Sequence, residues 1–126
     1  VHSLHVASLA LRLFDQTKRL HGLGDAERAW LEYAAMLHDV GYLINVRQHH
    51  KHSYYVIKHS DLTGFTAEEI ELIANIARYH RRALPASKHA PYDSLTPRHR
   101  RTIRILSALL RVADALDRTH FSIVQT

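Results

Sequence analysis

Cysteine is absent from this chain of 126 residues, which excludes disulfide bridges, thiolate zinc sites and cysteine nucleophiles together. No apolar run approaches the ~18 residues that a membrane-spanning helix needs, and no secretory signal pattern opens the sequence. We therefore expect a cytoplasmic protein with no membrane partner. Glycine is also scarce, and its four residues stand at expected helix ends and turns. This leaves no glycine-rich loop for cradling a phosphate.

The remaining composition is that of an ordinary globular protein with one unusual feature. Apolar residues make up 46% of the chain and charged residues 23%, which excludes a disordered segment. The length suits one domain with one hydrophobic core. Histidine, however, occurs 12 times. Because histidine is the commonest metal ligand, the positions of these residues decide whether the chain has a metal site.

The apolar residues recur at helical spacing, which predicts an all-α domain of five or more helices. The first is expected to end at Gly22, the second to have Asp25 as its N-cap, and the fourth to begin with a capping box formed by Thr66 and Glu69. Thr96 followed by Pro97 starts the last one. The predicted helices cover residues 3–20, 26–38, 50–60, 67–79 and 97–117.

The two ends of the sequence look like cuts. The helical spacing of apolar residues already begins at Val1, and residues 121–126 form a β-like run with no strand to pair with. We expect one helical domain over residues 1–120, followed over 121–126 by the truncated start of another segment. The chain is thus expected to be a piece of a longer protein.

Basic residues outnumber acidic ones by 17 to 12, and they are unevenly placed. Residues 94–113 contain five arginines and no acid, and residues 40–60 contain three basic residues and no acid. The guanidinium fork suits bidentate contacts with phosphate. Two interpretations remain open: a solvated basic face, or a surface for a polyanion such as nucleic acid, polyphosphate or a nucleotide.

The adjacent pair His38 and Asp39 ends an expected apolar helix and is the most specific candidate for a metal-binding site. A neutral ring nitrogen and a carboxylate together suit Mn²⁺, Fe²⁺, Co²⁺, Ni²⁺ or Zn²⁺ and tolerate Mg²⁺. Asp114 lies on the apolar half of the last helix, where a buried carboxylate needs a cation or a donor. Its partner is either Arg111 or Arg118, in an ion pair, or a metal.

His2 in the frame His-x-x-x-Val, the pair His38-Asp39 and the late Asp114 resemble the ligand order of the HD-domain superfamily of helical, metal-dependent phosphohydrolases. Longer blocks resemble the C-terminal HD-like domain of the exopolyphosphatase/guanosine pentaphosphate phosphatase (Ppx/GppA) family, from about His2 to His120. These blocks are residues 34–41, 49–53, 62–66 and 110–118.

The resemblance implies an HD-domain-like helical bundle with a divalent metal held by His2, His38, Asp39 and Asp114. His52 and His80 fall where binuclear members place ligands of a second ion. Metal-activated water would then attack phosphorus, with Arg81, Arg82 or Arg111 holding phosphate oxygens. Structural alternatives stay open, since His80 also suits a helix C-terminus and His52 a wet basic turn.

Most of the other histidines are expected to be solvated. His5 lies one turn from His2, but the spacing to Val6 favours His2 as the ligand. Five more stand at helix ends, in loops or beside basic residues: His21, His59, His89, His99 and His120.

The resemblance also implies a division of labour. Phosphate-chain cleavage belongs to an N-terminal actin-like part that these residues do not contain, so no catalytic residue is assigned here. This domain would bind polyphosphate or guanosine pentaphosphate and form a homodimer in the full-length protein. The expected polyanion surface comprises Arg81, Arg82, Arg98, Arg100, Arg101, Arg104 and Arg111.

Two other functions remain as alternatives. One is a free-standing HD-type phosphohydrolase that acts on a nucleotide or phosphoester through the same metal site. The other is a basic helical module that binds nucleic acid. Few aromatic side chains are left for base stacking, which disfavours the second alternative.

Overall fold

The structure, a computed structural model, describes residues 2–38, 54, 56–59, 62–80 and 95–124, and describes the backbone alone at 2–3 and 120–124. Helices and no strands occur in these residues, so the all-α prediction is confirmed. The principal helices are α1 (His2–Gln16), α2 (Lys18–His21), α3 (Asp25–Leu37), α5 (Ala67–Arg78) and α7 (Pro97–Val124). Most of the expected helix at 50–60 lies outside the described residues. None of the described helices is long and apolar enough to cross a membrane.

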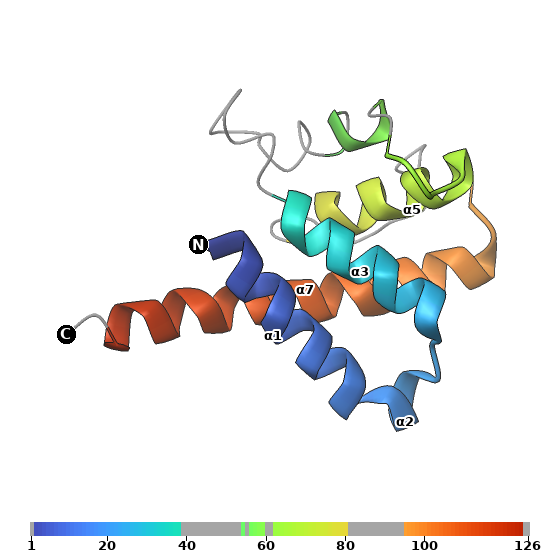
Figure 1. Ribbon diagram of the computed structural model, residues 1–126. Helices are drawn as coiled ribbons and strands as arrows, with labels where there is room; N and C mark the ends of the chain where they lie inside the picture. Colours follow the sequence, from blue (N-terminus) through green and yellow to red (C-terminus); the bar gives the residue numbers. More distant parts are fainter. Residues whose placement is uncertain (1, 39–53, 55, 60–61, 81–94, 125–126) are drawn as a thin grey trace.

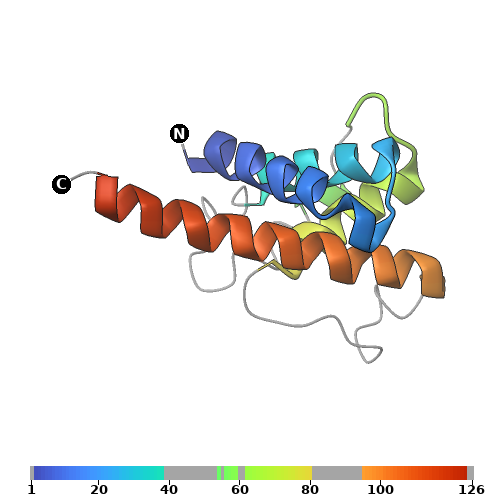
Figure 2. The same cartoon turned by 90° about the horizontal axis from the view of Figure 1, so that it is seen from below.

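The long helix α7 is the base on which the other helices pack (Figure 1). α1 packs against α3 and α7, and α5 packs against the same two helices. Figure 2 shows α1 lying alongside α7, whose last turns extend beyond the rest of the bundle. This arrangement brings the end of α3, the end of α5 and the middle of α7 around one core.

Small and large apolar side chains alternate in that core. Alanines in α1, α3 and α5 allow the helix backbones to approach closely, while bulkier residues fill the space between them. The fully buried core residues include Val6, Ala10, Phe14, Leu31, Ala34, Ala35, Ile73, Ile76, Ala77, Ile103, Leu106 and Leu110. One contiguous core of this kind is what the length of the chain predicts.

The first predicted helix is divided at Thr17. The Thr17 hydroxyl donates to the carbonyl of Leu13 at 2.6 Å, and the Thr17 amide donates to the same carbonyl at 3.0 Å. A threonine that bonds back to its own helix in this way favours a bend. The short α2 follows and ends at Gly22, whose left-handed φ of 67° suits glycine. The predicted stop at Gly22 is confirmed, but the continuous helix is not.

The N-cap of α3 is Gly24, one residue before the predicted Asp25. Its backbone amide donates to the Glu27 carboxylate at 2.8 Å. Asp25 becomes the first helical residue, where its charge still favours the positive end of the helix dipole.

The capping box of α5 is present as predicted. The Glu69 amide donates to the Thr66 hydroxyl at 3.1 Å, and the Thr66 amide donates to the Glu69 carboxylate at 3.0 Å. The second carboxylate oxygen of Glu69 accepts a 2.9 Å hydrogen bond from the Trp30 indole. Glu69 therefore caps its own helix and also joins α5 to α3.

Acidification is expected to weaken this connection. Hydrogen bonds from the Thr66 amide and the Trp30 indole hold the pKa of Glu69 below its ordinary value of 4.5. A carboxyl group whose pKa is lower in the folded state stabilises the fold above its unfolded pKa and loses that contribution as the pH falls through the folded pKa. Glu69→Gln should be less stable than the wild type at neutral pH, and the gap should shrink below about pH 4.5. Urea denaturation across pH 3–7 measures it, and a gap unchanged over that range would contradict the assignment.

The last helix begins as predicted, with Pro97 as its first residue and the Thr96 hydroxyl accepting from the His99 amide at 3.1 Å. Its end differs from the prediction. Residues 118–124 continue α7, so the β-like run expected from Phe121 is helical through Val124.

Candidate functional site

His38 lies at the end of α3 and is completely buried. Its Nδ1 atom is 2.5 Å from the carbonyl oxygen of Ala35. Because a carbonyl only accepts hydrogen bonds, Nδ1 carries a proton, and in the neutral form of the ring the lone pair is on Nε2. This is the tautomer in which a histidine ligates a metal through Nε2.

His80 repeats the same arrangement at the end of α5. It is 1% exposed, and its Nδ1 donates to the carbonyl of Ala77, three residues back along the chain. The two rings of His38 and His80 lie edge to face, with centroids 4.7 Å apart. Two helix ends thus bring into contact two buried imidazoles, each of which donates from Nδ1 to a carbonyl of its own helix.

Asp114 approaches His38 from the middle of α7. It is 5% exposed, and its Oδ1 lies 3.5 Å from Nε2 of His38. Its Oδ2 accepts a 3.1 Å hydrogen bond from Nε of Arg118. Of the two arginines expected as partners for Asp114, Arg118 forms the ion pair, while the other carboxylate oxygen faces the histidine.

The spacing between His38 and Asp114 suits two ligands of one ion. Two donors bound at about 2.0–2.1 Å around a tetrahedral ion lie about 3.4 Å apart. The observed 3.5 Å between Nε2 and Oδ1 matches this value and is longer than a normal N–H···O hydrogen bond. A ring nitrogen and a carboxylate oxygen are also a donor pair for the divalent metals expected from the sequence.

The rest of the predicted ligand set is not brought together in the described part of the chain. Asp39 and His52 lie outside the described residues, and His2 is described only as the start of α1. Among the side chains that the structure describes, no group of three or more His, Asp or Glu is arranged to hold a metal ion. The described residues therefore supply the His38–Asp114 pair, with His80 beside it.

Arg111 supports this site from α7. Its Nε donates to the carbonyl of His80 at 3.1 Å, and its Nη2 donates to the carbonyl of Tyr79 at 2.9 Å. These carbonyls end α5, where a cation is favoured by the helix dipole. Arg111 was expected to hold phosphate, and the structure shows it binding the backbone that carries His80.

Asp117 is a buried carboxylate that the sequence analysis did not select. It is 5% exposed, and its Oδ1 lies 3.6 Å from Nδ1 of His5, the histidine that was set aside in favour of His2. A hollow of about 230 Å³ between α1 and α7 is lined by His5, Ser8, Leu9, Arg12 and Asp117. The available signal was the three-residue spacing from Asp114, which places both carboxylates on the inner side of α7.

His21 was expected to be solvated, and this prediction is wrong. It is 8% exposed, its Nε2 donates to the carbonyl of Phe14 at 2.9 Å, and its Nδ1 accepts from the amide of Leu23 at 2.9 Å. Both hydrogen bonds are local, so the buried ring fixes the turn between α1 and α3.

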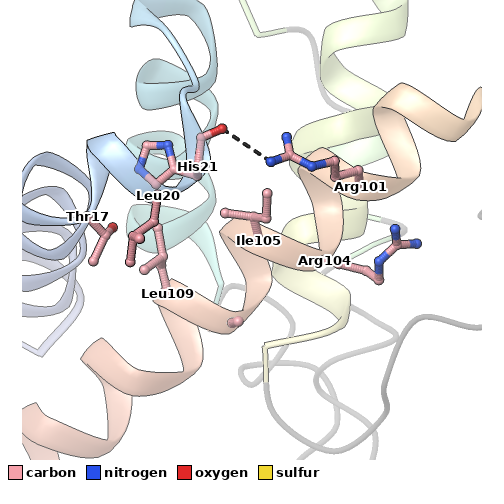
Figure 3. A pocket seen from close by; sticks show the side chains of 8 residues that line it. Thr17, Leu20, His21, Arg101, Arg104, Ile105 and Leu109 are labelled. Atoms are coloured by element: carbon pink, nitrogen blue, oxygen red, sulfur yellow. Dashed lines mark hydrogen bonds between the residues drawn. The ribbon is translucent and has the colours of Figure 1, made fainter.

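The predicted polyanion residues are only partly described. Arg98, Arg101 and Arg104 are exposed on α7 and Arg100 is half-buried, whereas Arg81 and Arg82 lie outside the described residues. Arg101 donates to the carbonyl of His21 at 3.3 Å, which closes one end of a groove between α2 and α7 (Figure 3). The groove encloses about 570 Å³ and is lined by Thr17, Leu20, His21, Arg101, Arg104, Ile105, Ala108 and Leu109.

Comparison with known proteins supports the family resemblance found in the sequence. Residues 1–125 match the family described as Ppx/GppA phosphatase, domain III. The guanosine-5'-triphosphate,3'-diphosphate pyrophosphatase of Pseudoalteromonas translucida (strain TAC 125) is 38% identical over 96 residues, which cover 71% of this chain and 18% of that protein. The protein of the same name from Vibrio vulnificus (strain YJ016) is 34% identical over 103 residues, 79% of this chain and 21% of that protein.

The chain therefore spans about a fifth of the length of these two relatives. The match to the family covers nearly every residue, including the segments that carry His38, His80 and Asp114. The chain belongs to the Ppx/GppA phosphatase family and represents its domain III.

Proposed function

We propose that this domain belongs to a protein that hydrolyses the phosphoanhydride bonds of guanosine pentaphosphate or of inorganic polyphosphate. The observation that carries the proposal is the match to domain III over residues 1–125. The names of the two relatives favour guanosine pentaphosphate as the substrate. The hydrolytic residues are expected elsewhere in the longer protein, and this domain contributes binding.

The basic N-terminal half of α7 supports a role in holding the polyanion. Arg98, Arg101 and Arg104 are exposed there, and this part of the helix contains no acidic residue. Such a surface attracts a chain of phosphates mainly through charge, with displacement of counterions. Because Arg111 binds backbone carbonyls, it contributes to the field of this surface more than to direct phosphate contact.

A second part of the proposal concerns a divalent metal. His38 and Asp114 would hold it, and the buried His80 lies against His38. A bound ion there would neutralise phosphate charge and lower the pKa of a water molecule. The residues of this chain supply the fixed tautomer of His38, the exclusion of solvent and an Asp114 carboxylate oriented by Arg118. With a metal bound at this site, the domain would also fit the alternative function of a free-standing phosphohydrolase.

Binding of polyphosphate tests the role of the basic surface. The triple variant R100A/R101A/R104A should bind polyphosphate at least tenfold more weakly than the wild type at 150 mM salt, with a shallower dependence of log Kd on log salt. Competition with guanosine pentaphosphate and with an oligonucleotide ranks the three ligands. A Kd for polyphosphate that changes neither with salt nor with these substitutions would exclude the polyanion surface. Preferential binding of the oligonucleotide would favour the nucleic-acid alternative.

Formation of a homodimer and a cytoplasmic location stay predictions. Sedimentation velocity of the full-length protein measures the first, and the absence of a dimer at micromolar concentration would contradict it.

A further inference from the structure

The two oxygen atoms of the Asp114 carboxylate face different partners. Oδ2 accepts a 3.1 Å hydrogen bond from Nε of Arg118, which lies four residues further along α7. Oδ1 lies 3.5 Å from Nε2 of His38, at the end of α3. The carboxylate therefore presents one oxygen to the candidate metal site, while the guanidinium of Arg118 holds the other.

This ion pair joins a buried side chain to a half-exposed one. The Asp114 side chain is 8% exposed and the Arg118 side chain 47%. Because burial removes water as an alternative donor, a buried carboxylate depends on the donors that the protein supplies. The guanidinium is planar and keeps its N–H groups in a fixed arrangement, so its contact with Oδ2 restricts rotation of the carboxylate. Arg118 thus determines which oxygen of Asp114 turns toward His38.

The number of oxygens that a carboxylate offers affects which ions it binds. Ca²⁺ takes about six to eight oxygen ligands, and one carboxylate often supplies two of them. Zn²⁺ prefers a tetrahedral site with nitrogen and oxygen ligands, and it accepts a single carboxylate oxygen. His38 and Asp114 supply one nitrogen and, with Arg118 in place, one oxygen. This donor pair suits ions of the zinc type better than Ca²⁺.

We propose that Arg118 is a positioning residue that makes Asp114 bind a divalent ion through Oδ1 alone, and that it thereby selects Zn²⁺ and related transition ions against Ca²⁺. Without the guanidinium, the carboxylate could turn and offer both oxygens. The inference rests on the metal site of the proposed function and adds the residue that sets its ion selectivity. It assigns Arg118 no direct contact with the ion.

The competing explanation is an ordinary ion pair that stabilises a helix. Oppositely charged side chains four residues apart do so slightly when both are exposed. Here the acid is buried, and its other oxygen faces a histidine on a different helix that is completely buried. Support of α7 alone would affect the binding of all ions equally. Positioning of the carboxylate predicts a change in the preference between ions.

Replacement of Arg118 by methionine tests this preference, because methionine is also long and unbranched but lacks the guanidinium. Isothermal titration calorimetry on the wild type and R118M gives the Kd for Zn²⁺ and for Ca²⁺. We expect the Zn²⁺ Kd to rise by about tenfold or more in R118M, the usual cost of losing a residue that orients a ligand. The Ca²⁺ Kd should stay the same or fall. R118K should lie between the two, since an ammonium group keeps the charge without the planar fork.

Absorption of bound Co²⁺ gives a second measurement that a loss of stability does not change. The d–d bands of Co²⁺ are intense in four-coordinate sites and weak when more ligands bind. If a second oxygen of Asp114 joins the ion in R118M, these bands should be weaker than in the wild type. The comparison is made at saturating Co²⁺, so that a difference in affinity does not enter.

The ion pair of Arg28 and Asp15 provides a matched control. It joins α3 to α1 through two 2.9 Å hydrogen bonds, and neither residue belongs to the candidate metal site. R28M removes the same guanidinium from an aspartate and should leave both Kd values and the Co²⁺ spectrum unchanged. Circular dichroism checks that each variant is folded.

The outcomes separate this inference from the proposal on which it rests. A wild-type chain that binds neither Zn²⁺ nor Co²⁺ would overturn the metal site, and the role of Arg118 with it. Binding of Zn²⁺ by the wild type, with the same ratio of Zn²⁺ to Ca²⁺ affinity and the same Co²⁺ spectrum in R118M, would overturn the role of Arg118 alone. Equal effects of R28M and R118M would also overturn it, because they would show a general loss of stability.

Discussion

Asparagine in place of His38 is expected to remove the response of this chain to divalent metal. A wild-type chain prepared without chelator should melt at a higher temperature when Mn²⁺ or Zn²⁺ is added. A ligand present at 100 times its Kd stabilises the folded state by about 2.7 kcal/mol. In a domain of this size that is a rise in Tm of roughly 10 °C.

The variants H38N and D114N should each lower metal affinity at least tenfold, because each removes a donor that no neighbouring residue replaces at the same position. The 3.5 Å separation of His38 Nε2 and Asp114 Oδ1 is the structural basis of this expectation. Metal content by elemental analysis gives a second measurement that does not depend on melting. It applies to each variant that circular dichroism shows to be folded.

A matched control uses His59, which is exposed and far along the chain from both helix ends of the site. H59N should respond to metal as the wild type does. A wild-type Tm that is indifferent to Mn²⁺ and Zn²⁺, with no metal in the purified protein, would exclude the site. Equal responses of H38N and the wild type would place the metal elsewhere.

Replacing Arg111 by methionine is expected to cost about 2–5 kcal/mol of folding free energy. The guanidinium donates to the carbonyls of Tyr79 and His80, at 2.9 Å and 3.1 Å. Hydrogen bonds from a charged donor contribute about 1.5–3 kcal/mol each, and a carbonyl left without its donor in a buried site carries a further cost. Lysine should not restore the loss, since one ammonium group lacks the planar fork that spans both carbonyls.

The measurement is urea denaturation of R111M and R111K, with R104M as the control. Arg104 is exposed on the same helix, one heptad earlier, and its replacement should change stability by about 0.5 kcal/mol or less. Because Arg111 holds the backbone of His80, R111M should also weaken the metal response. Equal stability losses in R111M and R104M would show that the two carbonyl contacts contribute little.

The helix boundaries that the sequence predicted correctly depend on neighbouring residues. The capping box of Thr66 and Glu69 and the start of α7 at Pro97 were both readable, because a helix N-terminus is completed by side chains within one turn. Gly22 was readable for the same reason, since a left-handed residue ends a helix locally.

Other helix boundaries depended on whether a side-chain hydrogen bond or a strand propensity outweighs continuation of the helix. The sequence pattern did not resolve this competition. Thr17 fits the helical rhythm, yet its hydroxyl bonds back to Leu13 and divides the predicted helix. The β-branched residues Ile123 and Val124 favoured a strand, but they continue α7, because adding a residue to a formed helix costs far less than starting a new element.

The sequence by itself determined the all-α class, the helix starts, the basic half of α7 and, through its ordered motifs, membership of the family. The tertiary structure decided which of the 12 histidines are buried and which of them meet. It placed His38 against both Asp114 and His80, buried His21 in a turn, and directed Arg111 to backbone carbonyls. The physical reason is the distance along the chain over which each kind of interaction acts. Caps and periodicity act within a few residues, whereas the partner of a buried polar group is fixed only when helices distant in the chain pack on one core.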